Sequence, residues 1–178
     1  MGTIFVAGTY GVGKSTLCHK LSEGLNVPEY SAGDIISEVN DEDYHVEKFV
    51  KDKAANQHIL ASKIQHLLAK FSTIILAGHF CIFDEKKNID HLPQNVFFEL
   101  GIGTIILLEA QVPKIIENLF NRDGKCYSER CLAALQKEER KVAHEIANDL
   151  RCNFYVHHMN FDETDVEECL SYLRGLKS

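Results

Sequence analysis

The sequence predicts an α/β fold in which a parallel sheet is covered by helices on both faces. Five short apolar runs alternate along the chain with segments of helical periodicity. Two of these runs, TIILA at 73–77 and TIILLE at 104–109, are almost continuous Ile and Leu. Such composition is typical of parallel strands that are buried on both faces. An alternating fold of this kind has right-handed crossovers and binds its ligand beyond the carboxyl ends of the strands.

Each expected element follows from its own residue pattern. The strands are the apolar runs at 3–7, 27–31, 73–77, 104–109 and 153–158. Helices are expected where apolar residues recur at helical spacing, at 15–25, 59–71, 127–150 and 166–173. The stretch 81–100 is the longest irregular one, and we expect it to combine a loop with a short helix. No repeat or linker interrupts the sequence, so we expect a single domain over 1–178.

Composition limits the classes of partner. The chain has 45% apolar and 25% charged residues, as soluble globular proteins do. Its net charge of −7 and its lack of a basic block argue against a nucleic-acid partner. No apolar run has the length of a membrane span and no signal peptide opens the chain, so we expect a cytoplasmic protein without a membrane partner. The six cysteines form no C-x-x-C pair, and we expect free thiols rather than disulfides or a zinc site.

A phosphate-binding loop is the most specific motif. Residues 8–15 match G-x-x-x-x-G-K-S, with an apolar run before them and a helical pattern after them. Glycines allow positive φ there, so that successive backbone N–H groups can surround a phosphate at the positive end of a helix dipole. The motif predicts that Lys14 neutralises the outer phosphates and that the Ser15 hydroxyl binds Mg²⁺. The nucleotide-binding residues expected are Gly8, Thr9, Tyr10, Gly11, Val12, Gly13, Lys14, Ser15 and Thr16.

A carboxylate follows the second expected strand. The run YSAGDII places Asp34 after Ser31 and Gly33, at a strand end that faces the same edge of the sheet as the phosphate loop. From there Asp34 can orient Mg²⁺-bound water or accept a proton from an attacking hydroxyl. Alternatively, Asp34 is the N-cap of a helix that begins at this residue, and the two roles are compatible.

The order of four motifs resembles that of adenylate kinases and related small nucleoside monophosphate kinases. These motifs are GTYGVGKSTL, YSAGDIISE, GHF and NLFNRDGKCY, and the greatest similarity is to the compact branch found in archaea and in eukaryotic nuclei. The resemblance implies a P-loop three-layer α/β/α fold, a five-stranded parallel sheet in the order 2-3-1-4-5, and a short lid at about 121–130. It also implies ATP and Mg²⁺ as cofactors. Carried over to this chain, Ser31, Gly33, Asp34 and His79 lie on the acceptor side, and Arg122 is the lid arginine.

The chain departs from this family at three places. Ala77 replaces an aspartate that would hold Mg²⁺ through water, so the metal is expected to depend on Ser15 and Asp34. Asn118 replaces an arginine, and one transition-state cation is missing unless Lys125 or Arg130 substitutes for it. No arginine follows Gly33-Asp34 to hold a phosphate of the acceptor. The nearest cations are Lys48, Lys51 and Lys53.

Two further segments have more than one interpretation. The loop HHMNFDE borders the base in this fold, so Asn160 to Asp162 are either base contacts or a plain connection. The charged residues at 137–141 are expected to form a solvated, salt-bridged helix face.

Three functions are consistent with these residues. The first is a kinase that transfers the γ-phosphoryl group of ATP to a nucleoside monophosphate or a similar small acceptor, with Lys14, Asp34 and Arg122 as catalytic residues. The second is an ATP-dependent switch or assembly factor with a protein partner, which Ala77 and Asn118 favour. The third is a nucleoside or polynucleotide kinase in which Asp34 is the base for a hydroxyl acceptor.

Overall fold

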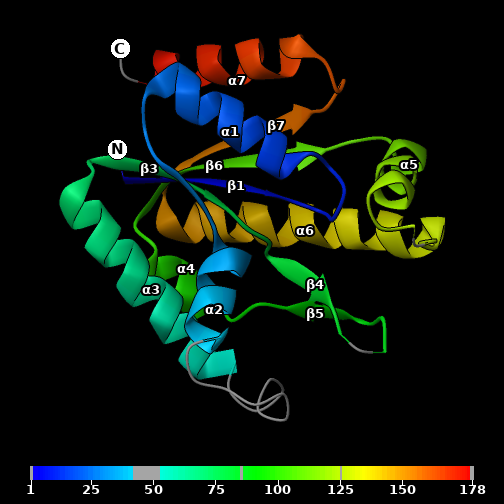
Figure 1. Ribbon diagram of the computed structural model, residues 1–178, viewed down its shortest axis with the longest axis horizontal. Helices are drawn as coiled ribbons and strands as arrows, with labels where there is room; N and C mark the ends of the chain where they lie inside the picture. Colours follow the sequence, from blue (N-terminus) through cyan, green and yellow to red (C-terminus); the bar gives the residue numbers. More distant parts are fainter. Residues whose placement is uncertain (1, 42–52, 85, 125, 177–178) are drawn as a thin grey trace.

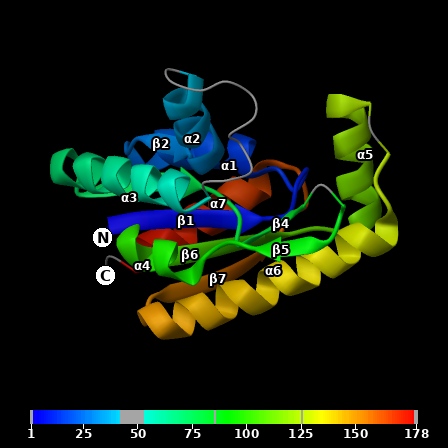
Figure 2. The ribbon, with the colours of Figure 1, turned by 90° about the horizontal axis from the view of Figure 1, so that it is seen from below.

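The computed structural model describes residues 2–41, 53–84, 86–124 and 126–176. It is a three-layer α/β/α fold with one five-stranded sheet in the middle layer (Figure 1). Helices α1 and α7 cover one face of the sheet, and α3, α4 and α6 cover the other (Figure 1). The start of β1 and the end of α7 lie at the same end of the molecule (Figure 2). Within the described residues, every helix is too short or too polar to cross a membrane.

The strands of the main sheet are all parallel. They are β1 (Gly2–Gly8), β2 (Glu29–Ser31), β3 (Thr73–Ala77), β6 (Ile102–Glu109) and β7 (Asn153–His158). Their spatial order is β2-β3-β1-β6-β7, with β1 paired in parallel to both β3 and β6. Counted along the chain without the separate hairpin β4–β5, this is the five-strand arrangement expected from the family resemblance.

Seven helices are present in the described residues. They are α1 (Lys14–Leu25), α2 (Ala32–Asp41), α3 (Lys53–Lys70), α4 (Gln94–Glu99), α5 (Val112–Asp123), α6 (Glu129–Leu150) and α7 (Glu163–Gly175). The periodic segments of the sequence therefore become α1, α3, α6 and α7. A helix near Asp34 and a short helix within 81–100 were expected on other grounds and become α2 and α4. Helix α5 was missed, although it has 12 residues and buries Ile115 and Leu119 at helical spacing.

The central strands are buried on both faces. On β1, Phe5 and Ala7 pack into the core beneath α3, α4 and α6, whereas Ile4 and Val6 pack beneath α1 and α7. All four side chains are at most 2% exposed. This alternation explains the near-continuous apolar runs, since successive side chains enter opposite cores.

The irregular stretch 81–100 contains a feature that the sequence did not predict. Strands β4 (Cys81–Phe83) and β5 (Ile89–His91) form a two-stranded antiparallel hairpin before the expected short helix, α4. The hairpin lies apart from the main sheet, near the carboxyl end of β3 (Figure 1). Its strands are only three residues long, which is too short for a period-two pattern to be recognised.

Several element boundaries differ from expectation by a few residues, and two of them bear on the site. The second strand begins at Glu29 rather than at residue 27. Helix α2 begins at Ala32, so Asp34 lies in its first turn and is not its N-cap. The capping interaction comes from Ser31, whose Oγ accepts a hydrogen bond from the Asp34 backbone N–H at 3.3 Å. A hydroxyl that accepts from the third residue of the helix is the usual N-cap geometry.

Candidate functional site

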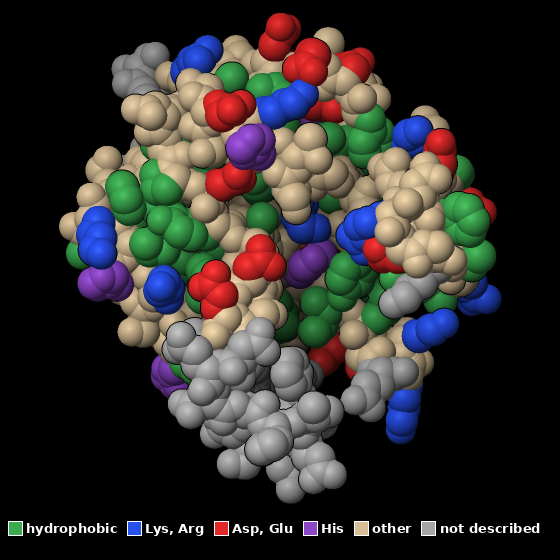
Figure 3. All heavy atoms as spheres, viewed as in Figure 1, with side chains coloured by type: hydrophobic (Ala, Val, Ile, Leu, Met, Phe, Trp, Pro, Cys, Tyr) green, Lys and Arg blue, Asp and Glu red, His purple; other side chains and the backbone are tan. Residues whose placement is uncertain are grey.

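One cavity collects most of the residues that the sequence singles out. It has a volume of about 590 Å³ and lies at the carboxyl ends of the strands, as expected for this fold. It opens on the face shown in Figure 3, where basic and histidine side chains lie at the bottom of a hollow. The expected site residues that line it are Tyr10, Gly11, Gly13, Lys14, Ser15, Thr16, Ser31, Gly33, His79 and Arg122.

The P-loop depends on its glycines. Gly8, Gly11 and Gly13 all have positive φ, with values of 146°, 73° and 97°. A Cβ atom at Gly11 would lie 2.7 Å from Cγ of Leu119, and one at Gly8 would lie 2.6 Å from the carbonyl oxygen of Leu108. The loop therefore requires glycine for both conformation and space, and its backbone follows the concave path that a phosphate-binding loop needs.

Lys14 is held inside the loop rather than on the surface. Its Nζ donates hydrogen bonds to the carbonyl oxygens of Gly8 at 2.7 Å and Thr9 at 2.8 Å. Burial lowers the pKa of the Lys14 amine to about 8, while the nearby carboxylate of Glu139 acts in the opposite direction. The amine is thus pre-positioned next to the backbone cradle, where a phosphate would gain a direct cationic partner.

Tyr10 joins the P-loop to the acceptor side. Its ring centroid lies 4.8 Å from that of His79 and 6.1 Å from that of Phe83 on the hairpin. Its hydroxyl oxygen accepts a hydrogen bond from the Phe83 backbone N–H at 3.3 Å. These contacts fix the Tyr10 side chain between the P-loop and the hairpin.

Two buried polar atoms at the site have no hydrogen-bond partner among the described residues. They are Oγ1 of Thr9 and Nδ1 of His79. Burial, followed by the charge of Lys14, lowers the pKa of His79 to about 3. His79 is therefore neutral at physiological pH. Unpartnered buried polar atoms are rare in proteins and often mark a position that a ligand completes.

Helix α5 contributes a hydrogen bond that supports the P-loop and a cation that lines the cavity. Asn118 donates from Nδ2 to the Gly11 carbonyl oxygen at 3.0 Å. Arg122, one turn later, lines the cavity and pairs with its neighbour Asp123 through Nε at 2.6 Å and Nη2 at 2.5 Å. The proposed lid segment runs from this last turn of α5, through Gly124 at φ 65°, to the first turn of α6.

Of the other cations considered in the sequence, only Arg130 has a side chain that the structure describes. Arg130 is exposed and is not among the described residues that line it. Lys48, Lys51 and Lys125 lie outside the described residues, as does the side chain of Lys53. Asp34 is exposed and is likewise absent from the described lining, although its neighbours Ser31 and Gly33 are part of it.

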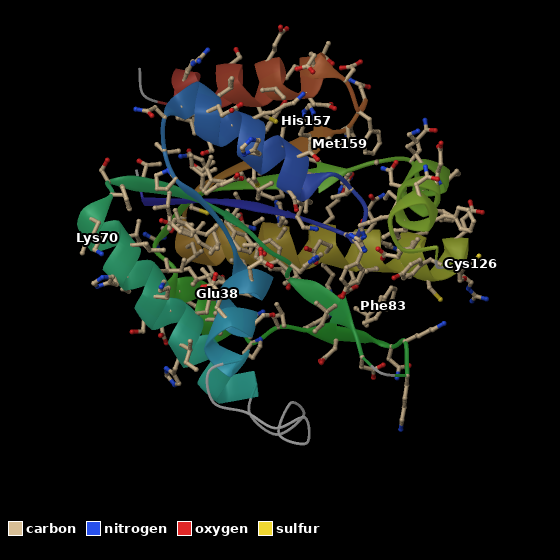
Figure 4. All side chains as sticks on the ribbon, in the orientation of Figure 1. Glu38, Lys70, Phe83, Cys126, His157 and Met159 are labelled. Carbon is tan, nitrogen blue, oxygen red and sulfur yellow. The ribbon has the colours of Figure 1, made fainter. Side chains whose placement is uncertain are left out.

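The loop between β7 and α7 forms another wall of the cavity. Met159, Phe161 and Asp162 line the cavity, and Met159 lies beside the start of α1 (Figure 4). The Met159 methyl group would be 3.2 Å from a Cβ at Gly13. The geometry therefore favours the interpretation in which this loop is part of the site, although Asn160 does not line the cavity.

Asp165 fixes the shape of this wall. The buried carboxylate accepts hydrogen bonds from the backbone N–H groups of Asn160 at 2.8 Å, Phe161 at 2.7 Å and Asp162 at 3.2 Å. It also contacts Nε2 of the buried His157 at 2.8 Å. These bonds hold Phe161 at φ 63°, a conformation that side chains seldom adopt outside functional or strained sites.

Glu139 lies behind the cavity lining, and the sequence analysis placed it wrongly, whereas Met159 and Asp165 line the cavity and were not predicted. We expected Glu139 on a solvated helix face, but its side chain is 1% exposed. Its two carboxylate oxygens accept backbone hydrogen bonds from Phe80 at 2.9 and 3.1 Å and from Cys81 at 2.7 Å. The expectation holds better for Glu138, which contacts Lys141 and His91 at the surface. The neighbouring Arg140 is paired with Glu109 at the end of β6.

The fold and the site together define the class of protein. A glycine-rich loop between the first strand and the first helix of a parallel sheet, with an inward lysine, is the P-loop nucleoside-triphosphate-binding architecture. The family model described as "AAA domain" matches residues 7–148, and the chain belongs to this family. A search of curated proteins gave no match.

Solved structures share the fold at low sequence identity. A gluconokinase from Sinorhizobium meliloti 1021 is 15% identical, with a TM-score of 0.59 over 98% of this chain and 93% of that chain. A shikimate kinase from Aquifex aeolicus is 20% identical, with a TM-score of 0.57 over 98% of both chains. TT1252 from Thermus thermophilus is 14% identical, with a TM-score of 0.62 over 99% of this chain and 98% of that chain. At these identities the similarity concerns the fold alone.

Proposed function

We propose that this protein is an ATP-dependent phosphotransferase that moves the γ-phosphoryl group of ATP to a small acceptor. One observation carries the proposal: Lys14 from the P-loop, Arg122 from α5 and His79 after β3 line a single cavity. A phosphate cradle, a cation and a group on the expected acceptor side thus open onto the same space. Phosphoryl transfer depends mainly on positioning and charge stabilisation, and these are the parts that it needs.

Each group has a distinct role in this proposal. The backbone N–H groups of residues 8–16 and the Lys14 amine bind the β- and γ-phosphates. Arg122 neutralises charge that develops on the transferred group once it turns from Asp123 towards the cavity. Met159 and Phe161 provide an apolar wall for the nucleotide base.

The donors present are compatible with Mg²⁺ that enters with the nucleotide. Ser15 is exposed to the cavity next to Lys14, and its hydroxyl would be the protein ligand, with phosphate oxygens and water completing the coordination. Such a metal ion bridges and neutralises phosphate oxygens. Among the described residues no cluster of three acidic, histidine or cysteine side chains could hold a metal without the nucleotide.

The family resemblance suggests a nucleoside monophosphate as the acceptor. A second candidate, a neutral acceptor that presents a hydroxyl group, is favoured by the charges around the cavity. The described cations of the lining are Lys14, Lys20 and Arg122, which come from the P-loop, α1 and α5. The acceptor-side lining contains neutral groups instead, including His79 with its low pKa.

The decisive experiment follows the γ-phosphate of labelled ATP. The protein would be incubated with panels of nucleoside monophosphates, nucleosides, small polyols and hydroxy acids, and oligonucleotides. Label in a small-molecule product is the expected result, and the panel that accepts it separates the two acceptor classes. Label found only as free phosphate would contradict the proposal and favour the ATP-dependent switch.

A further inference from the structure

A buried carboxylate connects the helix after the lid to the acceptor side of the cavity. Helix α6 begins after the lid segment with Ser128 as its N-cap, and it passes beneath the sheet (Figure 1). Glu139 stands near the middle of this helix. Its side chain points into the protein, and its carboxylate contacts the chain immediately after His79.

The hydrogen bonds of this carboxylate are to backbone groups that the sheets leave unpaired. Phe80 and Cys81 follow the turn at Gly78 and His79, where the chain leaves β3 and enters β4. Both oxygens of Glu139 accept from these N–H groups, at distances of 2.7–3.1 Å. Two oxygens that both accept indicate a charged carboxylate rather than a carboxylic acid, which would carry its own donor.

The surroundings of Glu139 act on its charge in two directions. Burial is the larger effect and raises the pKa of the carboxyl group above its ordinary value, whereas the amides of Phe80, Cys81 and Gly8 and the ammonium group of Lys14 act to lower it. Removal of a buried charge that satisfies several donors leaves those donors unpaired. The turn that carries His79 thus depends on a residue 60 positions further along the chain.

We propose that Glu139 is a positioning residue of the phosphoryl-transfer site, which fixes the turn Gly78–Cys81 so that His79 faces the P-loop. The expected effect of Glu139 on the reaction rate rests on the proposed function, whereas its contacts with the turn do not. The hydrogen bonds of Lys14 are to the carbonyl oxygens of Gly8 and Thr9 rather than to Glu139, although the Gly8 amide and the Lys14 charge also act on its carboxylate. Nucleotide binding should therefore depend on Glu139 much less than the reaction does.

The test compares Glu139→Gln with Glu138→Gln. Glu138 is the adjacent residue on α6 and bonds only surface partners among the described residues, so its variant is a matched control. We expect the Phe80 and Cys81 amides to exchange with solvent at least about tenfold faster in Glu139→Gln, because hydrogen bonds to a charged acceptor protect an amide more than bonds to a neutral one do. In Glu138→Gln the same two amides should exchange at the wild-type rate.

The functional readouts are the affinity for a non-hydrolysable ATP analogue and the total rate at which labelled γ-phosphate leaves ATP. We expect Glu139→Gln to keep the affinity within about threefold while the rate falls about 10- to 100-fold, as small misplacements at reacting centres do. This total rate counts γ-phosphate that leaves ATP by transfer to an acceptor and by hydrolysis. Failure of the proposed function would appear separately, as label found only in free phosphate from the wild-type protein.

Two results would overturn the proposal. One is unchanged amide exchange at Phe80 and Cys81 in Glu139→Gln. The other is a parallel loss of analogue affinity and rate, which would indicate general disruption of the P-loop. If Glu139→Gln does not fold, Glu139→Asp carries the same test, because it keeps the charge but withdraws the carboxylate by one methylene group. In that variant too, the Phe80 and Cys81 amides should exchange faster and the γ-phosphate should be released more slowly, while the affinity for the ATP analogue is preserved.

Discussion

Asn118 donates a hydrogen bond from its side-chain amide to the carbonyl oxygen of Gly11, at 3.0 Å. The fifth helix thereby holds the tip of the phosphate-binding loop. The family resemblance led us to regard this position as a missing arginine. The structure assigns it a different task, because the amide is engaged with the loop backbone and not free to reach a phosphate.

Loss of this brace should weaken nucleotide binding without abolishing it. In Asn118→Ala the Gly11 carbonyl loses its partner, at a cost of about 0.5–1.5 kcal/mol for a neutral hydrogen bond. We expect affinity for an ATP analogue to fall about 2- to 10-fold, measured by calorimetric titration. Asn121→Ala, in the exposed last turn of the same helix, is the control and should bind normally. Equal affinities of the two variants would show that the hydrogen bond does not support the loop.

Lys14→Ala should abolish phosphoryl transfer and reduce nucleotide affinity about 10- to 100-fold, as expected for loss of a charged hydrogen bond to phosphate. Because the Lys14 amine also bonds the carbonyl oxygens of Gly8 and Thr9, a small decrease in thermal stability should accompany the chemical loss. Circular dichroism checks the fold, and normal turnover by a folded variant would mean that the P-loop is not the phosphate site.

The fold was predictable because its signals are local and repeated. The strand runs at 73–77 and 153–158 match β3 and β7 to the residue. The phosphate loop was predictable for a related reason. Glycine at 8, 11 and 13 is demanded by backbone geometry, and a requirement of that kind is visible in one sequence.

The parts that escaped prediction depend on contacts between distant residues. Glu139 has the same charged neighbours as Glu138, and only the turn of α6 decides which carboxylate points inward. The apolar residues Leu135 and Val142 lie four before and three after Glu139, so its place on the buried stripe was a usable but overlooked signal. Asn118 carries no such signal, because its partner lies 107 residues away.

Bound nucleotide should protect the segment between α5 and α6 from proteolysis. Gly124 ends α5 in a left-handed conformation, and a Cβ added there would meet nothing within 4 Å. We expect trypsin to cut near Arg122 or Lys125 in the ligand-free protein, and an ATP analogue to slow this cut severalfold. Arg122 lies in the last helical turn, so the cut after Lys125 should dominate. Identical cleavage with and without the analogue would argue against a lid.

The charge of Arg122 should matter for transfer more than for binding. In this structure the guanidinium pairs with Asp123 at the cavity edge, where solvent screens it. Arginine cations that reach a transferring phosphoryl group contribute a factor of about 10³–10⁵ in rate. We therefore expect Arg122→Ala to lower the rate at saturating ATP by about 10³, with a much smaller change in analogue affinity. Arg130→Ala should behave as the wild-type protein, and equal effects of the two substitutions would remove Arg122 from its proposed role.

Burial of neutral His79 predicts a specific dependence of stability on pH. The pKa of His79 is about 3 in the folded protein and near 6.5 when the chain is unfolded. Between these values the unfolded state binds a proton that the folded state excludes. The free energy of unfolding should therefore fall as the pH drops from 6.5 towards 3, by up to about 1.4 kcal/mol per pH unit. Urea unfolding at several pH values should show this slope reduced in His79→Gln, and identical slopes would mean that His79 does not exclude the proton.

Asp34→Asn distinguishes two mechanisms of phosphoryl transfer. A hydroxyl acceptor benefits from a positioned base, and removal of such a base costs a factor of about 10²–10⁴ in rate. In this structure Asp34 is exposed and outside the described lining of the cavity, and its backbone N–H, not its carboxylate, makes the bond to Ser31. We therefore expect Asp34→Asn to lower the rate only severalfold at unchanged analogue affinity. Ser31→Ala, which removes the N-cap, should instead destabilise α2 by about 1 kcal/mol. A loss of 10² or more in Asp34→Asn would show that α2 moves on substrate binding and brings the carboxylate to an acceptor hydroxyl.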